Sequence, residues 1–402
     1  MNRRTFLQLG STGLLGAAMS ACSNEPPPGR YTQADIALLT AQQRAERQLS
    51  GTGPHGRQVY AGYRGLSELP WFDLDESGRL RCTDESIPYA IDIHSHLGIS
   101  TLFAPDIDLQ ARPTRLRHLL DCDASTPGCE LNLDVYANSN FTEQMLQDLE
   151  RSTLAQGLWG SPFSATQTIP ALLDEMDAMR VEKSVVLPIK LGFPFGDDLT
   201  ERWRRGIEDA GADKRLVAGL SVHPRGRNRL EEMRAHAATG ARVMKLHPTV
   251  QSFYPDDPIM APVYEEAQRL GLIVFFHGGR AGIEPPSRMR YALPRHYEAV
   301  LAGFPKLQVI IGHAGARDMT NMVPMAQQYE NAWLDIHGQG VTALDEIIAA
   351  TGGERLLFGS DWTFYHIGMT LAKVLICTEA PSTRPMRQRI LRDNAIALLG
   401  LN

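Results

Sequence analysis

The feature that most constrains the fold is a regular alternation of short apolar runs and helix-like stretches from Thr168 to the C-terminus. The runs are rich in Val, Ile, Leu and Phe and many are bounded by Gly, which is typical of parallel strands buried on both faces. One further run, at 90–93, precedes this region. Counting it, the pattern predicts eight strands, each followed by a helix, and hence an α/β fold of the (β/α)8 TIM-barrel type.

The expected strands lie at 90–93, 183–189, 216–222, 241–246, 272–276, 307–312, 332–336 and 356–360. The expected helices lie at 169–180, 198–210, 229–238, 259–270, 296–303, 319–330, 343–350 and 369–377, and a further one, at 384–391, closes the chain.

Polar residues that can bind a metal or move a proton stand where several of these strands end. They are His94 and His96 after the first strand, Lys245 in the fourth, His277 after the fifth, His313 after the sixth and Asp361 after the eighth. Alternate residues of a strand share a face, so His94 and His96 are expected to point the same way as a pair of metal ligands. The carboxyl ends of barrel strands form the active face, so we expect the whole set to converge there.

This arrangement resembles the amidohydrolase superfamily. It is closer to the amidohydrolase-related branch that includes aminocarboxymuconate semialdehyde decarboxylase, resorcylate-type decarboxylases and lactone hydrolases. The resemblance covers about residues 87 to 401, including an ending typical of that branch, Asp393-Asn394-Ala395 followed by Leu398-Leu399-Gly400. The chain departs from the branch in a long insertion after the first strand and in its N-terminus, and both departures bear on the substrate.

The resemblance implies one divalent ion, Zn²⁺ by preference, held by three imidazoles and a carboxylate with a position left for water. The ligands it implies are His94, His96, His277 and Asp361. His313 is the expected general base or acid, and Asp361 is expected to share the proton. In other branches a strand-4 lysine is carboxylated and bridges two metals, so Lys245 with a second ion remains an alternative.

Several arginines follow the fifth strand, between residues 280 and 295. A guanidinium can grip a carboxylate with two parallel hydrogen bonds, and we expect Arg280, the one nearest His277, to bind substrate. The remaining arginines are expected to pair with acids of the protein in a solvated loop.

The N-terminus predicts export. Asn2-Arg3-Arg4-Thr5-Phe6-Leu7 resembles a twin-arginine signal, and Met19-Ser20-Ala21-Cys22 resembles a lipoprotein cleavage box with Met in place of the usual Leu. We expect residues 1–21 to be a signal peptide and Cys22 to carry lipid, anchoring the protein to the membrane on the periplasmic side. Cleavage after Ala21 without lipidation, giving a periplasmic protein, is the alternative.

Residues 22–86 are expected to form a tether and an N-terminal extension, helical at 32–49 and irregular at 50–90, and residues 87–402 the barrel. The inserted segment, 97–163, with helices expected at 113–120 and 142–156, should lie over the active face as a lid, or serve as a packing or dimerisation arm. Cys122 and Cys129 flank a turn and either form a disulfide or stay free, while Cys82 and Cys377 are expected to be buried thiols.

The composition limits the partners. A net charge of -6 without a basic stripe excludes nucleic acid as an expected ligand. We therefore expect a metal-dependent hydrolase that uses a metal-bound water on a small lactone, ester or amide. The alternatives are a metal-dependent non-oxidative decarboxylase of a small aromatic or unsaturated acid, and a non-catalytic, metal-binding surface lipoprotein; a homodimer stays open.

Overall fold

The structure is a computed structural model that describes residues 31–101, 107–123, 129–158 and 160–401. The chain divides into two compact units, Met1–Leu38 and Leu39–Asn402. Of the first unit only residues 31–38 are described, and they contain the beginning of helix α2, Gln33–Leu49, as predicted. The predicted signal peptide and Cys22 lie outside the described residues.

Eight parallel strands close into a barrel in the second unit. Strands β4, β6 and β7 form one sheet, and β8 to β12 form another in chain order. Parallel bridges between Leu220 and Met244 and between Ser95 and Trp362 join the two sheets at both edges. The predicted (β/α)8 barrel is therefore confirmed, with strands β4 (Ala90–Ser95), β6 (Val181–Val186), β7 (Leu216–Ala218), β8 (Val243–Leu246), β9 (Ile273–Phe276), β10 (Val309–Ile311), β11 (Ala332–Asp335) and β12 (Leu356–Leu357).

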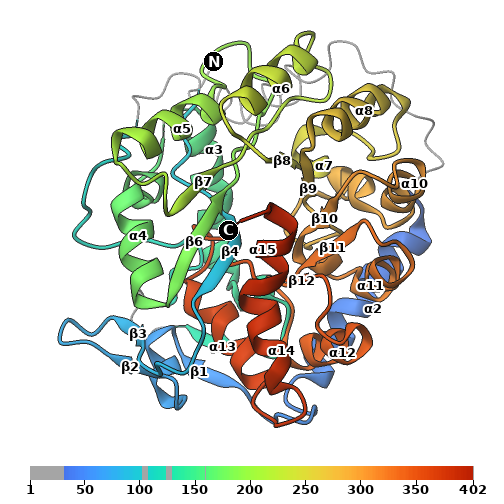
Figure 1. Ribbon diagram of the computed structural model, residues 1–402. Helices are drawn as coiled ribbons and strands as arrows, with labels where there is room; N and C mark the ends of the chain where they lie inside the picture. Colours follow the sequence, from blue (N-terminus) through green and yellow to red (C-terminus); the bar gives the residue numbers. More distant parts are fainter. Residues whose placement is uncertain (1–30, 102–106, 124–128, 159, 402) are drawn as a thin grey trace, which may run out of the picture. The chain divides into compact units, whose positions relative to one another are not determined.

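A helix follows each barrel strand before the next one begins (Figure 1). These helices are α4 (Ile169–Ala178), α5 (Leu199–Asp209), α6 (Arg229–Ala238), α8 (Ala261–Leu270), α10 (Arg295–Gly303), α11 (Met319–Gln328), α12 (Val341–Thr351) and α13 (Ile367–Cys377). Their bounds agree with the predicted ones to within a few residues.

The core has two layers. The larger layer packs the outer faces of the strands against the surrounding helices, and the smaller one fills the barrel with branched and aromatic side chains such as Ile93, Val185 and Phe275. Ala395 of helix α15 (Asn394–Leu399) belongs to the inner layer, and Figure 1 shows this helix near the middle of the ring of strands. The interior of the barrel is thus a packed core, and we expect the functional residues at the ends of the strands.

The segments outside the barrel differ in part from expectation. Residues 113–120 were predicted to be helical but are irregular, because their backbone groups bond to distant segments: Leu119 N donates to Thr363 O over 3.1 Å. Helix α3, Glu143–Leu158, forms as predicted. The extension, predicted to be irregular, contains three short strands: β1 (Val59–Ala61), which pairs with β5 (Glu130–Asn132) of the insertion, and the hairpin of β2 (Phe72–Leu74) and β3 (Leu80–Cys82).

The insertion lies against loops that follow the barrel strands. Leu119 bonds to the loop after β12, and Ala137 N donates to Gly338 O, after β11, over 2.8 Å. Asn138 Nδ2 donates over 3.3 Å to Ala281 O, after β9. These contacts place this part of the insertion at the carboxyl ends of the strands, where a lid would have to be. The domain boundaries at 21/22 and 86/87 stay predictions.

Cys122 and Cys129 form a disulfide, with their Cα atoms 4.8 Å apart, so of the two alternatives the disulfide is confirmed. Cys82 and Cys377 are buried free thiols, also as expected.

Replacing both Cys122 and Cys129 by Ser is expected to lower the free energy of unfolding by about 2 kcal/mol, because the open chain regains the entropy of a short loop. Urea unfolding under non-reducing conditions measures the difference. The Cys82→Ser variant controls for loss of a buried sulfur, and an unchanged midpoint in the double variant would contradict the prediction.

A buried carboxylate holds the insertion to the barrel. Glu175 of α4 accepts a hydrogen bond from His118 Nε2 of the insertion at 2.9 Å and lies 3.7 Å from His366 Nδ1. Burial alone would raise the pKa of Glu175, but the imidazoles of His366 and His118 and the bonds it accepts outweigh burial and lower the pKa to about 2. Burial lowers the pKa of His366, and the charge of Glu175 only partly offsets this effect.

Because the pKa of Glu175 is lowered on folding from 4.5 to about 2, its ionisation stabilises the fold above pH 4.5, and this stabilisation is lost as the pH falls towards 2. The Glu175→Gln variant should lose about 1 to 3 kcal/mol at pH 7 and depend less on pH in that window. Unfolding measured at a series of pH values tests this. Parallel stability curves for the two proteins between pH 5 and pH 2 would refute it.

Candidate metal centre

The His-x-His pair ends β4 with both rings oriented by a hydrogen bond at Nδ1. His94 Nδ1 lies 2.8 Å from Asp335 Oδ2, and His96 Nδ1 lies 2.6 Å from Leu187 O. A carboxylate and a carbonyl can only accept, so both Nδ1 atoms carry the proton. The lone pair of each Nε2 therefore points away from these anchors, which is the orientation that metal binding requires.

Three potential ligand atoms form a compact triangle at the end of β4. His94 Nε2 lies 3.3 Å from His96 Nε2 and 3.5 Å from Asp361 Oδ1, and His96 Nε2 lies 3.2 Å from Asp361 Oδ1. Ligands around a tetrahedral zinc ion with bonds of about 2.0–2.1 Å are separated by about 3.3 Å. The triangle therefore has the size of one face of a zinc coordination sphere.

Local backbone geometry holds the carboxylate in place. Asp361 has a φ of 52°, a conformation that non-glycine residues rarely adopt, and its N donates to His94 O over 2.7 Å. Such strain persists only where the surrounding structure fixes it, and it is common at functional sites.

Lys245 reaches the same point from β8. Its Nζ lies 3.0 Å from His94 Nε2 and 4.1 Å from the centre of the Phe275 ring. Burial lowers the pKa of Lys245 to about 8, against the opposing charges of Asp361 and Asp335. Its amine is thus more easily deprotonated than that of an exposed lysine.

His313 and His277 form the other side of the centre. His313 belongs to a group with His94 and Asp361 whose ligand atoms all lie within 4.8 Å of one another. Its Nε2 lies 3.1 Å from His277 Nδ1, and the His277 ring stacks on His247 with centroids 4.0 Å apart. The structure therefore places His313 nearer to the triangle than the sequence suggested, with His277 beside it.

Two buried nitrogens on this side have no hydrogen-bond partner, His313 Nδ1 and His277 Nε2. His277 Nε2 does lie 3.6 Å from Glu284 Oε1, which is beyond hydrogen-bond range. Burial lowers the pKa of His313 well below its ordinary value, with the neighbouring His277 adding to the effect. Burial and Lys245 do the same for His94. Neutral imidazoles with unpaired nitrogens are the form that binds a cation, so the residues present fit a divalent metal.

Asp335 is a central residue that the sequence interpretation missed. Its Oδ2 accepts from His94 Nδ1 and from His313 N at 3.1 Å, and its Oδ1 accepts from His337 N at 3.1 Å. It therefore ties together the ends of three strands. Asp335 is the last residue of β11, so a search for polar residues at strand ends could have identified it as it identified Asp361. It was missed because the apolar Ile336 follows it and extends the predicted strand by one residue.

The sequence interpretation also missed a second carboxylate, Asp92, which bonds to the backbone beside the triangle. Asp92 accepts hydrogen bonds from His94 N at 3.0 Å, from Ser360 N at 2.9 Å and from Ser360 Oγ at 2.6 Å. Burial raises the pKa of Asp92 to about 7. It joins β4, which contains His94, to the segment after β12 that leads to Asp361.

Arg280, which the sequence predicts to bind substrate, pairs with a carboxylate of the protein. Its Nε and Nη2 donate to Asp318 at 2.9 Å and 2.5 Å, and the side chain is 1% exposed. A guanidinium whose fork already holds a carboxylate of the protein is not available to a substrate carboxylate. In this structure Arg280 therefore positions the loop after β9, and its binding of substrate stays a prediction.

The fold is thus a closed parallel barrel that carries, at its strand ends, a cluster of histidines and carboxylates able to hold a metal ion. The sequence model of the family described as Amidohydrolase matches residues 91–401. The chain belongs to the amidohydrolase family, whose members are typically metal-dependent enzymes. A comparison with curated protein sequences finds no match.

The solved structures to which this chain is similar are distant from it in sequence. An uncharacterized TIM-barrel protein from Bordetella bronchiseptica is 19% identical, with a TM-score of 0.53 over 77% of this chain and 98% of that one. The apo form of IDCase from Metarhizium anisopliae is 19% identical, with a TM-score of 0.49 over 79% and 98%. A 5-carboxyvanillate decarboxylase from Sphingomonas paucimobilis is 16% identical, with a TM-score of 0.46 over 57% and 82%. At these identities the likeness concerns the fold alone.

Proposed function

We propose that this protein is a metal-dependent hydrolase of a small lactone, ester or amide. The observation that carries the proposal is the triangle of His94 Nε2, His96 Nε2 and Asp361 Oδ1, whose edges of 3.2 to 3.5 Å suit one small divalent ion. His277 is the fourth ligand, and a single ion, Zn²⁺ by preference, agrees with this set of donors.

A bound divalent ion supplies Lewis acidity, which lowers the pKa of water and polarises a substrate carbonyl. The residues of the chain provide orientation and proton transfer. His313 is neutral and has an unpaired Nδ1, so it can take a proton from the attacking water and return it to the leaving group. Asp361 Oδ2 is the carboxylate oxygen that is not part of the triangle, and it lies 3.8 Å from His337 Nε2. It can assist in that proton transfer.

We prefer hydrolysis over decarboxylation because Arg280 and Arg317 are already paired with groups of the protein. A decarboxylase substrate carries a carboxylate, and Arg280, the residue expected to bind it, is paired with Asp318. Arg317, in the loop after β10, is also engaged, since its Nε lies 3.1 Å from Glu46 Oε2 and its Nη2 donates to Ser139 Oγ. Neither provides a ready site for a substrate anion, and a neutral acyl substrate suits the centre better.

The test is a panel of lactones, esters and amides beside a panel of aromatic and unsaturated carboxylic acids, assayed with the metal-loaded protein. We expect turnover in the first panel with uptake of one water per bond broken, and its loss in Asp361→Asn. Release of CO₂ from the second panel without activity in the first would overturn the proposal in favour of the decarboxylase. Metal binding without turnover in either panel would favour the non-catalytic lipoprotein.

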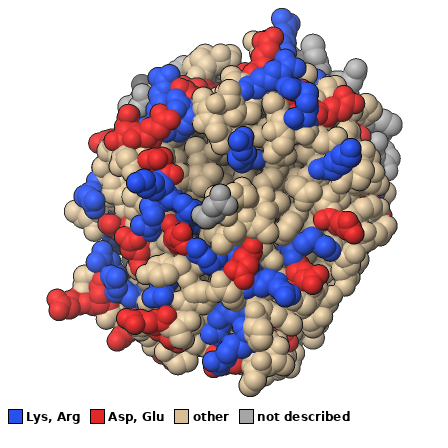
Figure 2. Space-filling model, in the orientation of Figure 1, with Lys and Arg blue, Asp and Glu red and all other residues tan. Residues whose placement is uncertain are grey.

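We further propose that the protein is exported and lipid-anchored through Cys22. The proposal rests on the twin-arginine and cleavage-box patterns of residues 2–7 and 19–22. In the described ranges no helix has the length and hydropathy of a membrane span. On the face drawn in Figure 2, basic and acidic side chains are interspersed. Cell fractionation should find the protein with membranes and the Cys22→Ala variant in the soluble fraction; equal distribution of both would contradict the anchor.

A further inference from the structure

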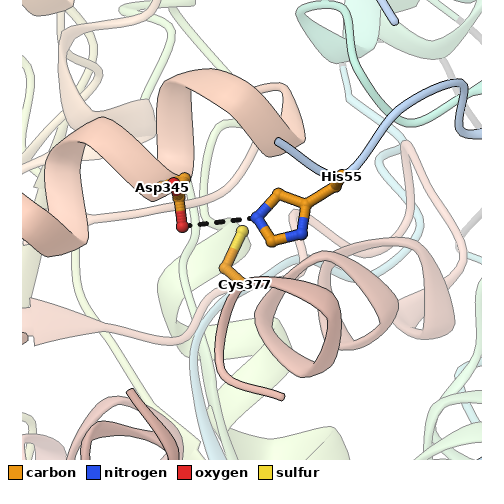
Figure 3. Close-up of side chains that lie close together, drawn as sticks. All are labelled: His55, Asp345 and Cys377. Carbon is orange, nitrogen blue, oxygen red and sulfur yellow. Dashed lines mark ion pairs between the residues drawn. The ribbon is translucent and has the colours of Figure 1, made fainter. Parts of the chain in front are cut away.

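Figure 3 shows three side chains that can bind a metal and that lie close together, none of them assigned to the barrel centre. His55 comes from the N-terminal extension, Asp345 from α12 and Cys377 from the last position of α13. One ligand atom of each lies within 4.8 Å of the other two. Segments that are far apart in the sequence thus bring a nitrogen, an oxygen and a sulfur donor to one point.

The bonding of His55 is incomplete. Its Nε2 lies 3.3 Å from Asp345 Oδ1, close enough for an ion pair, yet the contact does not have hydrogen-bond geometry and this buried nitrogen has no hydrogen-bond partner. A buried polar atom left without a partner destabilises the fold, so the arrangement is better explained if the atom binds something else.

Cys377 is the buried corner of the group. Its side chain is 2% exposed, and its thiol donates a weak hydrogen bond to Val341 O at 3.4 Å. Burial, together with the charge of Asp345, raises the pKa of this thiol. The thiol therefore stays protonated unless a cation replaces its proton.

The donor set identifies the class of ligand. A thiolate, an imidazole and a carboxylate form a typical set for Zn²⁺ and related transition-metal ions, whereas Mg²⁺ and Ca²⁺ prefer oxygen alone. Bonds of about 2.0–2.3 Å place neighbouring ligand atoms about 3.3–3.8 Å apart, and the His55–Asp345 separation of 3.3 Å already falls in that range. The half-buried His55 and Asp345 leave an open side where water can serve as the fourth ligand.

We propose that His55, Asp345 and Cys377 bind one divalent transition-metal ion of the zinc class at a site separate from the barrel centre. On binding, the Cys377 S–H bond breaks, its proton goes to solvent, and a sulfur–metal bond forms. The ion joins the extension to α12 and α13 and thereby holds the segment around His55 against the barrel. A ligand bound only by the folded protein raises stability by mass action, so the site is structural rather than catalytic.

Cobalt(II) titration of the metal-free full-length chain tests this, because cobalt bound to a thiolate shows a near-ultraviolet charge-transfer band. None of the residues assigned to the barrel centre is a cysteine, so the band reports on the second site alone. In a Cys22→Ser background the free thiols are Cys82 and Cys377. We expect the band to appear, to disappear in Cys377→Ser and to persist in the matched control Cys82→Ser.

His55→Ala, at a half-exposed position, is a second variant that does not disturb a helix. It should weaken or remove the same band while circular dichroism shows an intact fold. Zinc should also raise the melting temperature more in the parent protein than in Cys377→Ser or His55→Ala. Absence of the sulfur band in the parent protein, or its persistence in Cys377→Ser, would overturn the proposal without affecting the barrel centre.

Discussion

His313→Asn is expected to lower kcat by about 10²- to 10⁴-fold while the metal stays bound, because this substitution removes the proposed base and not one of the three triangle ligands. The unpaired Nδ1 of His313 and its place within 4.8 Å of the His94 and Asp361 ligand atoms support this role. Steady-state kinetics on the substrate found in the panel, beside elemental analysis of the same samples, measures both quantities.

His277→Asn is the matched control, since both substitutions replace neighbouring imidazoles 3.1 Å apart by the same amide. It is expected to lose the metal as well as activity. If instead His313→Asn loses the metal and His277→Asn retains it, His313 is the metal ligand and His277 is the base. Full activity in His313→Asn would refute the mechanism.

Asp335→Asn is expected to weaken metal binding by about 10- to 100-fold, because the partner that orients a ligand imidazole tunes its basicity and direction. The carboxylate accepts from His94 Nδ1 at 2.8 Å and also from the backbone of His313 at 3.1 Å, so both sides of the centre depend on it. Competition with a chelator of known affinity measures the change.

Asp318→Asn serves as the control for this prediction. It too is a buried carboxylate, but it pairs with Arg280 away from the triangle and should destabilise the fold without changing metal affinity. Equal metal affinity in Asp335→Asn and the parent protein would show that Asp335 is not a positioning residue.

The barrel could be predicted from the sequence because its signals are local. A strand buried on both faces, such as 273–276, must be apolar throughout, and each following helix needs only one apolar face. The residue after such a strand in a parallel barrel has to lie at the carboxyl rim. For that reason the sequence alone was enough to group His94, His96, His313 and Asp361 at one site.

What could not be predicted depends on partners distant in the sequence. The pairing of Arg280 depends on Asp318, 38 residues later. The irregular path of 113–120 follows from backbone bonds to the loop after β12, which helical spacing does not reveal. The meeting of His55 with Asp345 and Cys377 depends on how the extension folds back, for which the sequence carries no periodic signal.

The central claim is that one divalent ion is held by His94, His96 and Asp361 at the barrel's strand ends. Elemental analysis per protomer tests it most directly. The first protein carries Cys377→Ser, which removes the second site, and the second protein carries Cys377→Ser together with His94→Ala. We predict about one equivalent of metal in the first protein and none in the second. Two equivalents that both depend on His94 would indicate a carboxylated Lys245 between two ions. No tightly bound metal in either protein would contradict the account.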